Sequence, residues 1–410
     1  MEVAIITSGY FPVPASKGGA VEALDECLIE KNEEYKRIKF EILSIYDEKA
    51  QELSRKYKNS NFTFIKASKL ITTLDKFVYW IAKYILRKQK HMSYRYIFQR
   101  LYYINEVSKI LKKNNYDKVI IENHSTLFMA LKKRNNYQKY KGRYYYHLHN
   151  EVTNDYGCKE IIKNCRKVLG VSNYINGTLV EFLGEVDNKK LDVLKNCVNI
   201  DRFNKSTNDG KVEELRKKYG IKDDEKVVIF TGRLNEEKGI KELLLAFKKV
   251  RYEKVKLLIV GSYYYASGMV SSFESQLHIL AQEMKDKIIF TGFIPYSEVS
   301  NIYGIGDIAA IPSMWNDPAP LTIIESMASG LPIITTYSGG IPEYANEQCA
   351  VFLKRDNNIV NNFAMAIDKL LSDETLMHQM SKAGRITASK LNLDNYYKNF
   401  IEKISEGENV

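Results

Sequence analysis

Short runs of apolar, β-branched and aromatic residues alternate along this chain with stretches of helical periodicity. Such alternation is typical of an α/β fold, because parallel strands need a crossover helix between them. We expect strands at VAIITS, FEILSIY, FTFI, KVIIE, YYYHLH and VLGVS in the first half, and at VVIFTG, KLLIVG, IIFTG, IAAIPS, PIITT and AVFL in the second. Most end in Gly, Ser, Asn or His, the small and polar residues expected where parallel sheets bind ligands.

The length of 410 residues exceeds what one ordinary core holds, so two domains are expected. The polar segment EVDNKKLDVLKNCVNIDRFNKS separates the two groups of strands and marks the boundary between about 187 and 205. We therefore expect a first nucleotide-binding-type domain at 1–190 and a second at 200–385. The tail, 386–410, has helical periodicity and is expected to pack back on the first domain.

Composition favours a globular protein of a reducing cytoplasm. The start, MEVAIITSGYFPVP, has no basic region before its short apolar run, and no run approaches the length of a membrane span. The five cysteines are scattered without CxxC spacing, so neither a disulfide framework nor a structural zinc site is expected. The spacing of other residues indicates no metal cluster either.

Positive charge is concentrated in the first half. Residues 51–150 hold 22 Lys and Arg against 5 Asp and Glu, a net charge of +17, whereas residues 201–410 hold 26 against 28, a net charge of −2. This asymmetry indicates an anionic partner for the first domain, either a membrane face, nucleic acid or an acidic substrate. No recognised nucleic-acid motif is present, so no nucleic-acid partner is expected.

An amphipathic segment, LDKFVYWIAKYILRKQK, opens the aromatic and basic stretch 74–103. On a helix its apolar stripe and its basic residues lie on opposite sides, with Tyr79 and Trp80 adding amphipathic rings. The stripe is Leu74, Phe77, Val78, Ile81 and Ile85, and the basic residues are Lys76, Lys83, Arg87 and Lys90. Two interpretations are open: the stripe packs on the domain core, or the segment docks on an anionic membrane surface.

The stretch WNDPAPLTIIESMASGLPIITTYSGGIPEY predicts a helix that begins at Pro320–Leu321, because proline fits only the first turn. The N–H groups of Leu321 and Thr322 then form an anion site. Glu325 lies roughly 7 Å further along the helix, near the spacing from a distal phosphate to a ribose. Asp317 precedes the helix on the side of a transferred group. The alternative is that Glu325 and Asp317 are a solvated helix face and an N-terminal cap.

Two further motifs point to phosphate. In TGRLNEEKGIKELLLAF, Arg233 follows a strand and Lys238 precedes a helix, so the two cations could bind a diphosphate, although a surface charge pair is the alternative. Gly18 and Gly19 precede a helix in TSGYFPVPASKGGAVE and could present backbone N–H groups to a phosphate, or form only a turn. SGGIPE is a turn that allows close backbone approach.

The order of these motifs, with NCVNIDRF before them, resembles the retaining glycosyltransferases of family 4. The resemblance spans nearly the whole chain and is strongest from Asn196 to Glu343. It implies an α/β GT-B fold, two Rossmann-like domains facing across a cleft. It also implies a nucleotide-sugar donor as co-substrate, without a further cofactor or an essential metal.

The resemblance assigns roles residue by residue. Arg233 and Lys238 match the basic pair on the diphosphate, Glu325 the ribose-binding glutamate, and His149 in HLHNEVTND the histidine near the donor sugar. We expect His147 to point to the other face of the strand and to be packed, and His124 is a lesser candidate. The implied catalytic residues are His149, Asp317, Arg233 and Lys238. The implied donor-binding residues are Gly18, Gly19, Arg233, Lys238, Phe293, Ile294, Asp317, Ala319, Pro320, Leu321, Thr322 and Glu325.

Some residues depart from the family pattern. Asp317 stands where the family usually has glutamate, and Pro320 stands where many members have glycine, which removes an N–H donor. NCVN replaces the common NGVD. These departures bear on the identity of the donor more than on the reaction.

The expected function is therefore sugar transfer with retention, from a UDP-linked donor to a glycan or lipid-linked acceptor, in synthesis of a cell-surface polysaccharide such as capsule or exopolysaccharide. The enzyme is expected in the cytoplasm, peripheral at the inner face of the plasma membrane. A GT-B-fold nucleotide-sugar epimerase is the alternative enzyme, and a nucleic-acid-binding protein is the non-enzymatic one.

Overall fold

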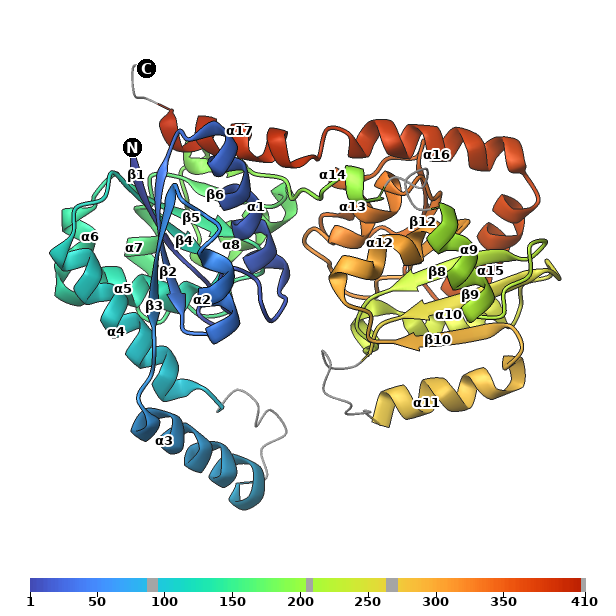
Figure 1. The fold of residues 1–410 in the computed structure, drawn as a ribbon, viewed down its shortest axis with the longest axis horizontal. Coiled ribbons are helices and arrows are strands. Elements are labelled where there is room, and N and C mark those ends of the chain that lie inside the picture. The colour runs from blue at the N-terminus through green and yellow to red at the C-terminus, as the bar shows by residue number, and fades with distance from the viewer. Residues whose placement is uncertain (87–94, 204–208, 263–271, 407–410) are drawn as a thin grey trace. The chain divides into compact units, whose positions relative to one another are not determined.

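The computed structural model describes residues 1–86, 95–203, 209–262 and 272–406 (Figure 1). The chain forms two compact units, one of Met1–Lys195 with Tyr396–Val410 and one of Asn196–Asn395. The division falls inside the polar segment in which the sequence placed the boundary.

The first unit is built on a seven-stranded parallel sheet with the order β3-β2-β1-β4-β5-β6-β7. Its strands are β1 (Glu2–Ile6), β2 (Lys39–Ile45), β3 (Ser60–Ile65), β4 (Lys118–Glu122), β5 (Tyr144–Leu148), β6 (Val168–Gly170) and β7 (Leu191–Val193). The helices between them are α1 (Ala20–Tyr35), α2 (Glu48–Ser54), α3 (Lys69–Trp80), α4 (Ile97–Lys113), α5 (Phe128–Lys132), α6 (Asn136–Lys139), α7 (Lys159–Lys163) and α8 (Asn173–Leu183). A π-helical turn, Ile81–Ile85, continues α3.

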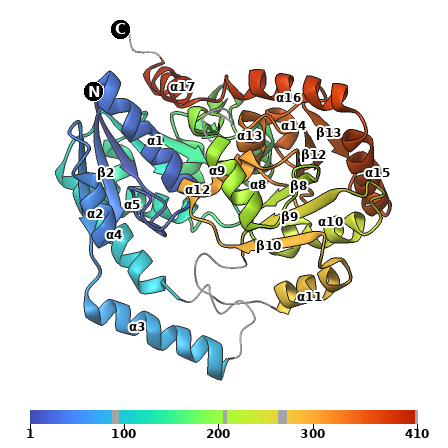
Figure 2. The same ribbon diagram turned by 45° about the vertical axis from the view of Figure 1, so that its right-hand side comes forward.

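The C-terminal helix α17 (Leu393–Ser405) packs on this unit beside α1, as both ribbon views show (Figures 1 and 2). The Tyr397 hydroxyl lies 2.7 Å from Asn32 Oδ1 of α1, and Tyr145 of β5 donates to the Ile404 carbonyl over 3.0 Å. Its packing on the first unit, which the sequence predicted, is therefore confirmed.

The second unit has a six-stranded parallel sheet with the order β10-β9-β8-β11-β12-β13. Its strands are β8 (Lys226–Thr231), β9 (Val255–Val260), β10 (Ile288–Gly292), β11 (Ile308–Ile311), β12 (Ile333–Thr336) and β13 (Ala350–Leu353). Its helices are α9 (Asp209–Lys218), α10 (Ile240–Phe247), α11 (Ser272–Ala281), α12 (Tyr296–Gly304), α13 (Leu321–Ala328), α14 (Ile341–Tyr344), α15 (Ile359–Leu371) and α16 (Glu374–Ala388). Alternate strand residues such as Val228 and Phe230 pack with α10 and α15 in one buried core.

The expected α/β class, two parallel Rossmann-like sheets, is confirmed, and all the predicted strands are present. β7 was not predicted, because Leu-Asp-Val is short and lacks an apolar run. In the part of the chain that the structure describes, no helix is both long and apolar enough to cross a bilayer.

Candidate functional site

The carboxyl ends of the second sheet gather most of the predicted donor residues at one edge, because all its strands are parallel. Arg233 follows β8, and Phe293 with Ile294 follow β10. The loop with Asp317 follows β11, and SGGIPE follows β12. Arg233 and Phe293 are exposed, whereas Ile294 is partly buried. Among the described residues Arg233 forms no ion pair, so its charge is directed to solvent at this edge.

Lys238 and Asp317 form an ion pair that joins the loops after β8 and β11. Lys238 Nζ lies 2.5 Å from Asp317 Oδ2, and the side chain of Asp317 is only 7% exposed. The ammonium group also lies 5.6 Å above the Trp315 ring. Lys238 is therefore partly buried and paired with a buried carboxylate, whereas Arg233 is exposed as a surface charge would be. The pair holds a cation in one place, beside a carboxylate, at the carboxyl edge of the second sheet.

Two glycines permit this close approach of loops. Gly239 has φ of 69°, and a Cβ there would lie 1.9 Å from the Pro312 carbonyl oxygen. Gly339, with φ of 52°, would place a Cβ 2.3 Å from the Asp317 carbonyl oxygen. Only glycine fits both the backbone conformation and the space. The turns in TGRLNEEKG and SGGIPE thus pack against the two ends of the loop that carries Asp317.

Helix α13 begins at Leu321, where the sequence placed it. Its N-cap is Pro320, in an extended conformation and without a side-chain cap. The preceding Ala319 is buried, and its carbonyl accepts a 3.0 Å hydrogen bond from Asn196 Nδ2. The first residue of NCVN therefore fixes the entry to the helix. The partly buried Leu321 and Thr322 lie in the first turn, where a helix offers N–H groups to an anion.

Glu325 lies in the interior of the second unit. It is 3% exposed, and its Oε2 accepts a 3.0 Å hydrogen bond from the Tyr303 hydroxyl of α12. Burial raises the pKa of Glu325 to about 7, against the opposing effect of hydrogen bonds from Tyr303 and Tyr296. The alternative of a solvated helix face and cap is therefore wrong for Glu325 and Asp317.

The loop after β11 also carries two buried polar atoms that lack a partner. Ser313 Oγ and Trp315 Nε1 form no hydrogen bond within the described residues. Buried donors are usually satisfied, so atoms of this kind indicate a polar ligand or water at the loop.

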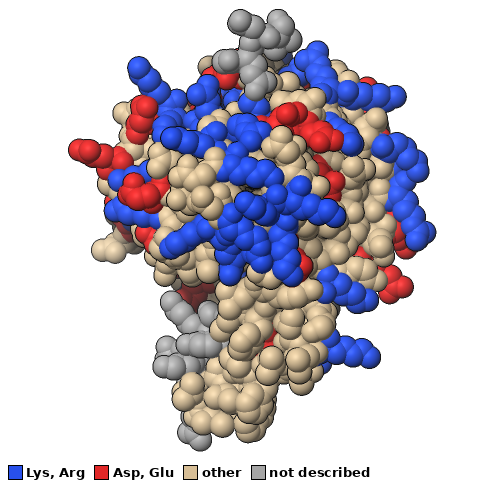
Figure 3. Space-filling view, turned by 90° about the vertical axis from the view of Figure 1, so that its left-hand side faces the viewer, with Lys and Arg blue, Asp and Glu red and all other residues tan. Residues whose placement is uncertain are grey.

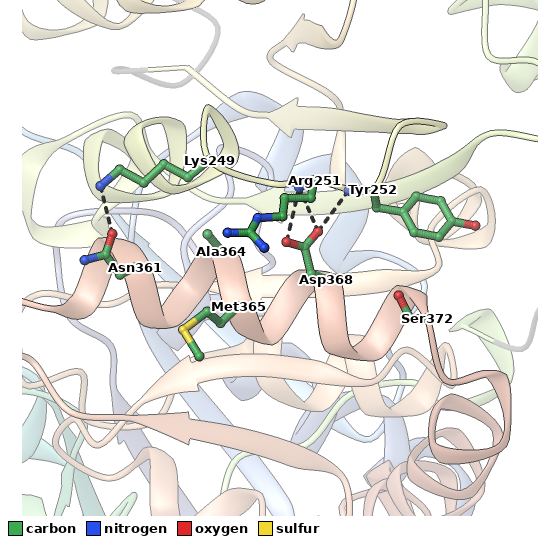
Figure 4. Close-up of a pocket in the computed structure, with 8 residues that line it drawn as sticks. All are labelled: Lys249, Arg251, Tyr252, Asn361, Ala364, Met365, Asp368 and Ser372. Carbon is green, nitrogen blue, oxygen red and sulfur yellow. Dashed lines mark hydrogen bonds between the residues drawn. The ribbon is translucent and has the colours of Figure 1, made fainter.

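A shallow groove elsewhere in this unit is a poor candidate (Figure 4). It is lined by Lys249, Arg251, Tyr252, Asn361, Ala364, Met365, Asp368 and Ser372. Arg251 and Tyr252 precede β9, so the groove lies toward the amino end of the sheet. Asp368 of α15 already accepts the backbone N–H groups of both residues. The groove thus lacks the position, at the carboxyl ends of the strands, that ligand sites of parallel sheets occupy.

In the first unit, Gly18 and Gly19 precede α1 with φ of 78° and 106°. A Cβ on Gly18 would meet open space, whereas one on Gly19 would lie 2.1 Å from Glu22 Oε2. Glu22 is buried and contacts Ser8, which follows β1. The positive φ of Gly19, together with the nearby Glu22 carboxylate, favours glycine there, and Gly18 leaves the backbone open.

His149 follows β5 and lies beside His147 rather than on the opposite side from it. His149 Nε2 lies 3.2 Å from His147 Nδ1, and both nitrogens face Glu122 Oε2. The expectation that His147 points to the other face is wrong, because residues two apart on a strand share a face. His147 is fully buried, as expected. His124, after β4, contacts Thr126 and Tyr10 instead.

Comparisons with known proteins bear on both units. The family model "Glycosyl transferases group 1" matches residues 211–387. The chain is 31% identical to YtcC of Bacillus subtilis over 248 residues, which span 58% of this chain and 60% of YtcC. It is 27% identical to spore coat protein SA of B. subtilis over 69% of this chain and 76% of that protein. It is 23% identical to the lipopolysaccharide 1,2-N-acetylglucosaminetransferase of Salmonella typhimurium, over 70% of this chain and 72% of that protein.

Residues 211–387, which match this family model, lie within the second unit. Solved structures agree with the fold over the whole chain. A glycosyltransferase from Rickettsia africae has a TM-score of 0.74 at 20% identity, covering 100% of this chain and 99% of that one. Anabaena Alr3699/HepE in complex with UDP and glucose has a TM-score of 0.70 at 16% identity, covering 99% of this chain and 100% of that one. The expected GT-B fold class is therefore confirmed.

The residues that match the group 1 glycosyltransferase model include all the predicted site residues except Gly18, Gly19 and His149. The sequence did not single out Glu122 or Asp25, which the structure places in a buried cluster with the two histidines. The available signals were weak: a glutamate ending KVIIE, and two histidines spaced by one residue at the end of the next strand.

Proposed function

We propose that the chain transfers a sugar from a nucleotide-diphosphate sugar to an acceptor hydroxyl, with retention of anomeric configuration. The observation that carries the proposal is the fixed cation Lys238, held by Asp317 at the ligand-binding edge of a group 1 glycosyltransferase domain. A departing diphosphate is the part of the donor that gains charge, and a preorganised cation stabilises it.

The donor would lie along the carboxyl edge of the second sheet. Arg233, Lys238 and the first turn of α13 hold the diphosphate, and the glycine loop at Gly18 and Gly19 is assigned to the same phosphates on the family resemblance. Glu325 accepts hydrogen bonds from the ribose hydroxyls. The base lies against the backbone at Phe293–Ile294.

The transfer step would be mainly electrostatic. The glycosidic bond to the diphosphate breaks as the acceptor oxygen attacks the same face of the sugar, and the acceptor proton passes to the departing phosphate oxygen. Asp317, with Ala319 and Pro320, faces the transferred sugar. His149 is assigned to that sugar on the resemblance alone. This scheme needs no metal at the diphosphate, because Arg233, Lys238 and the α13 N-terminus supply the positive charge.

Relatives support a UDP-linked donor and a cell-surface product. UDP and glucose are bound in the Anabaena structure, and the Salmonella relative is named for lipopolysaccharide. We therefore assign the acceptor to a glycan or lipid-linked glycan of a surface polysaccharide, of the capsule or exopolysaccharide kind, made in the cytoplasm.

Mass spectrometry of the protein incubated with a panel of nucleotide sugars tests the proposal. One donor should be hydrolysed slowly alone and consumed faster with a glycan acceptor of matching class. The epimerase alternative predicts instead that a labelled donor changes into its epimer without any acceptor. Sugar transfer would be contradicted if none of the donors were consumed, or if a donor changed into its epimer.

Helix α3 is the element considered for contact with an anionic membrane surface. It extends below the first sheet in both ribbon views (Figures 1 and 2). Leu70 is 72% exposed, Phe77 57% and Ile85 60%. The interpretation in which the stripe packs on the core is therefore wrong for Leu74, Phe77 and Ile85, whereas Val78 and Ile81 are half-buried. Arg87, Lys90 and the rest of 87–94 lie outside the described residues.

A polar contact explains why the apolar side faces out. Asp75 is buried and accepts the backbone N–H groups of Phe98 and Gln99 at 2.8 and 2.9 Å, at the first turn of α4. The carboxylate thus caps α4 and attaches α3 by its polar side. Trp80 and Tyr84 are left exposed beside the apolar stripe.

A basic patch lies above this apolar lobe on one face of the unit (Figure 3). Apart from the buried Arg100, the basic residues of α4–α6 and the segments that follow them are Lys109, Lys112, Lys113, Lys132, Lys133, Arg134, Lys139, Lys141 and Arg143. Exposed apolar rings beside clustered cations are typical of a surface that enters an anionic lipid leaflet. We therefore assign the exposed apolar side of α3 and the turn that continues it, Lys69–Ile85, to docking on the inner face of the plasma membrane.

Cosedimentation with vesicles checks this assignment. The protein should bind anionic vesicles at low salt, bind less as salt rises, and bind neutral vesicles much less, since each basic residue near the leaflet contributes about 1 kcal/mol. Phe77→Ser should lower partition about 10-fold, because an inserted ring is lost. Trp80 fluorescence should shift to the blue on binding.

Ile279→Ser is the matched control, because Ile279 is 63% exposed on α11 of the second unit. It should leave partition unchanged. Equal binding to neutral and anionic vesicles, or none to either, would contradict membrane docking and favour an acidic soluble acceptor for the basic patch.

A further inference from the structure

A buried cluster of imidazoles and carboxylates lies at the carboxyl ends of β4 and β5 in the first unit. Glu122 is the last residue of β4 and pairs in register with His147 of β5. Because the strands are adjacent and parallel, their side chains at this register lie on the same face, and His149 lies two residues further on. Glu122 and His147 are fully buried, and His149 is 6% exposed.

The three donor atoms form a compact triangle. His147 Nδ1 lies 3.0 Å from Glu122 Oε2, His149 Nε2 lies 3.2 Å from the same oxygen, and the two nitrogens are 3.2 Å apart. Tetrahedral zinc has bonds of about 2.0–2.1 Å to nitrogen and oxygen, so neighbouring ligand atoms lie about 3.3 Å apart. The triangle therefore has nearly the dimensions of one face of a tetrahedral zinc site, and it arises without any ion.

The charge around the triangle also favours a cation. Asp25 of α1 is 1% exposed, and neither of its oxygens has a hydrogen-bond donor among the described residues. Three buried carboxyl groups, those of Glu22, Asp25 and Glu122, share one region. A buried carboxylate without a cation is costly, so such a group either takes up a proton or lies near a metal.

We propose that Glu122, His147 and His149 bind one Zn²⁺ ion, with water in the fourth position and the buried carboxyl group of Asp25 beside Glu122. Two imidazoles and a carboxylate are ligands typical of zinc, whereas Mg²⁺ and Ca²⁺ prefer oxygen alone. The ion ties the ends of β4 and β5 together and fixes the ring of His149 through Nε2. Substrate contacts of His149 would then use the other edge of the ring. The proposal does not depend on the sugar-transfer reaction.

Metal titration of the whole chain tests the site. The protein is stripped with a chelator, its cysteines are alkylated, and Zn²⁺ is added in a calorimeter. One ion per chain should bind and should raise the melting temperature by mass action. Co²⁺ in place of Zn²⁺ should give the visible absorption of a four-coordinate site without a thiolate charge-transfer band.

Variants locate the ion. Glu122→Gln preserves the shape of the side chain, and His149→Ala changes the residue at the strand end. Each should weaken binding more than about 100-fold, because even the loss of an outer partner costs about 10- to 100-fold. Asp25→Asn should weaken binding about 10-fold. His124→Ala is the control from the same unit and should bind like the wild type.

Two results would overturn the proposal. Absence of Zn²⁺ binding by the stripped, folded wild type would mean that the cluster holds protons only. Unchanged binding by folded Glu122→Gln would assign the ion to residues outside the cluster.

Discussion

Replacing Lys238 by glutamine should lower turnover of the donor about 100- to 1000-fold while the second unit stays folded. The loss corresponds to removal of one preorganised group that stabilises charge in a transition state. Glutamine can still donate a hydrogen bond to Asp317, so the buried carboxylate keeps a partner and the loop after β11 keeps its place. Steady-state release of nucleoside diphosphate measures the effect, and circular dichroism and thermal melting check the fold.

Lys241→Gln is the matched control, because Lys241 is exposed on α10 one turn beyond Lys238. It removes the same charge from the same helix region and should keep wild-type turnover. Wild-type turnover in folded Lys238→Gln would contradict the assignment of Lys238 to the diphosphate. Equal losses in both variants would mean that general surface charge, and not a fixed cation, acts on the donor.

Replacing Glu325 by glutamine should change the dependence of stability on pH. The pKa of this carboxyl is raised from 4.5 to about 7 in the folded chain. The folded state therefore holds the proton more tightly than the unfolded state does. Ionisation costs stability as pH rises from about 4.5 through 7, and a shift of this size corresponds to about 3 kcal/mol. Glutamine does not ionise, so this cost disappears.

Denaturant unfolding at pH 4 and pH 8 measures the effect. The free energy of unfolding of Glu325→Gln minus that of the wild type should be about 3 kcal/mol larger at pH 8 than at pH 4, so the variant gains stability relative to the wild type as pH rises. Glu298→Gln, on the exposed side of α12, is the control for a simple change of charge. A pH-independent difference between Glu325→Gln and wild type would contradict a buried carboxyl with a raised pKa.

The same substitution should weaken donor binding about 10- to 100-fold, because a carboxylate that accepts ribose hydroxyls is replaced by a neutral amide. Stability and binding should thus change in opposite directions at pH 8. Unchanged donor affinity would remove Glu325 from the ribose site and leave it as a buried partner of Tyr303.

The sequence predicts the two sheets well because buried parallel strands are continuous apolar runs that end in small or polar residues. It fails at β7, Leu191–Val193, whose pairing with β6 comes from position in the sheet rather than from an apolar pattern. It also predicts the start of α13, because Pro320 restricts where that helix can begin.

Contacts made across long sequence distances account for what the sequence does not predict. Lys238 and Asp317 are each recognisable, but their ion pair depends on loops that only the folded sheet brings together. Asp25 and Glu122 lie far apart in sequence, so no local pattern marks their cluster with the histidines. The outward apolar side of α3 depends on Asp75, whose partners lie at the start of α4.

Calorimetric titration of the nucleotide part of the donor tests the central claim most directly. The panel of nucleotide sugars first identifies the donor and so its base. The affinities of the nucleoside diphosphate and monophosphate with that base are then measured for the wild type and for Lys238→Gln. The diphosphate should bind the wild type at least about 10-fold more tightly than the monophosphate, because a charge-assisted contact to the distal phosphate contributes about 1.5–3 kcal/mol. The difference should shrink in Lys238→Gln. Equal affinity of the wild type for both nucleotides, or an unchanged difference in the variant, would contradict a diphosphate site at Lys238.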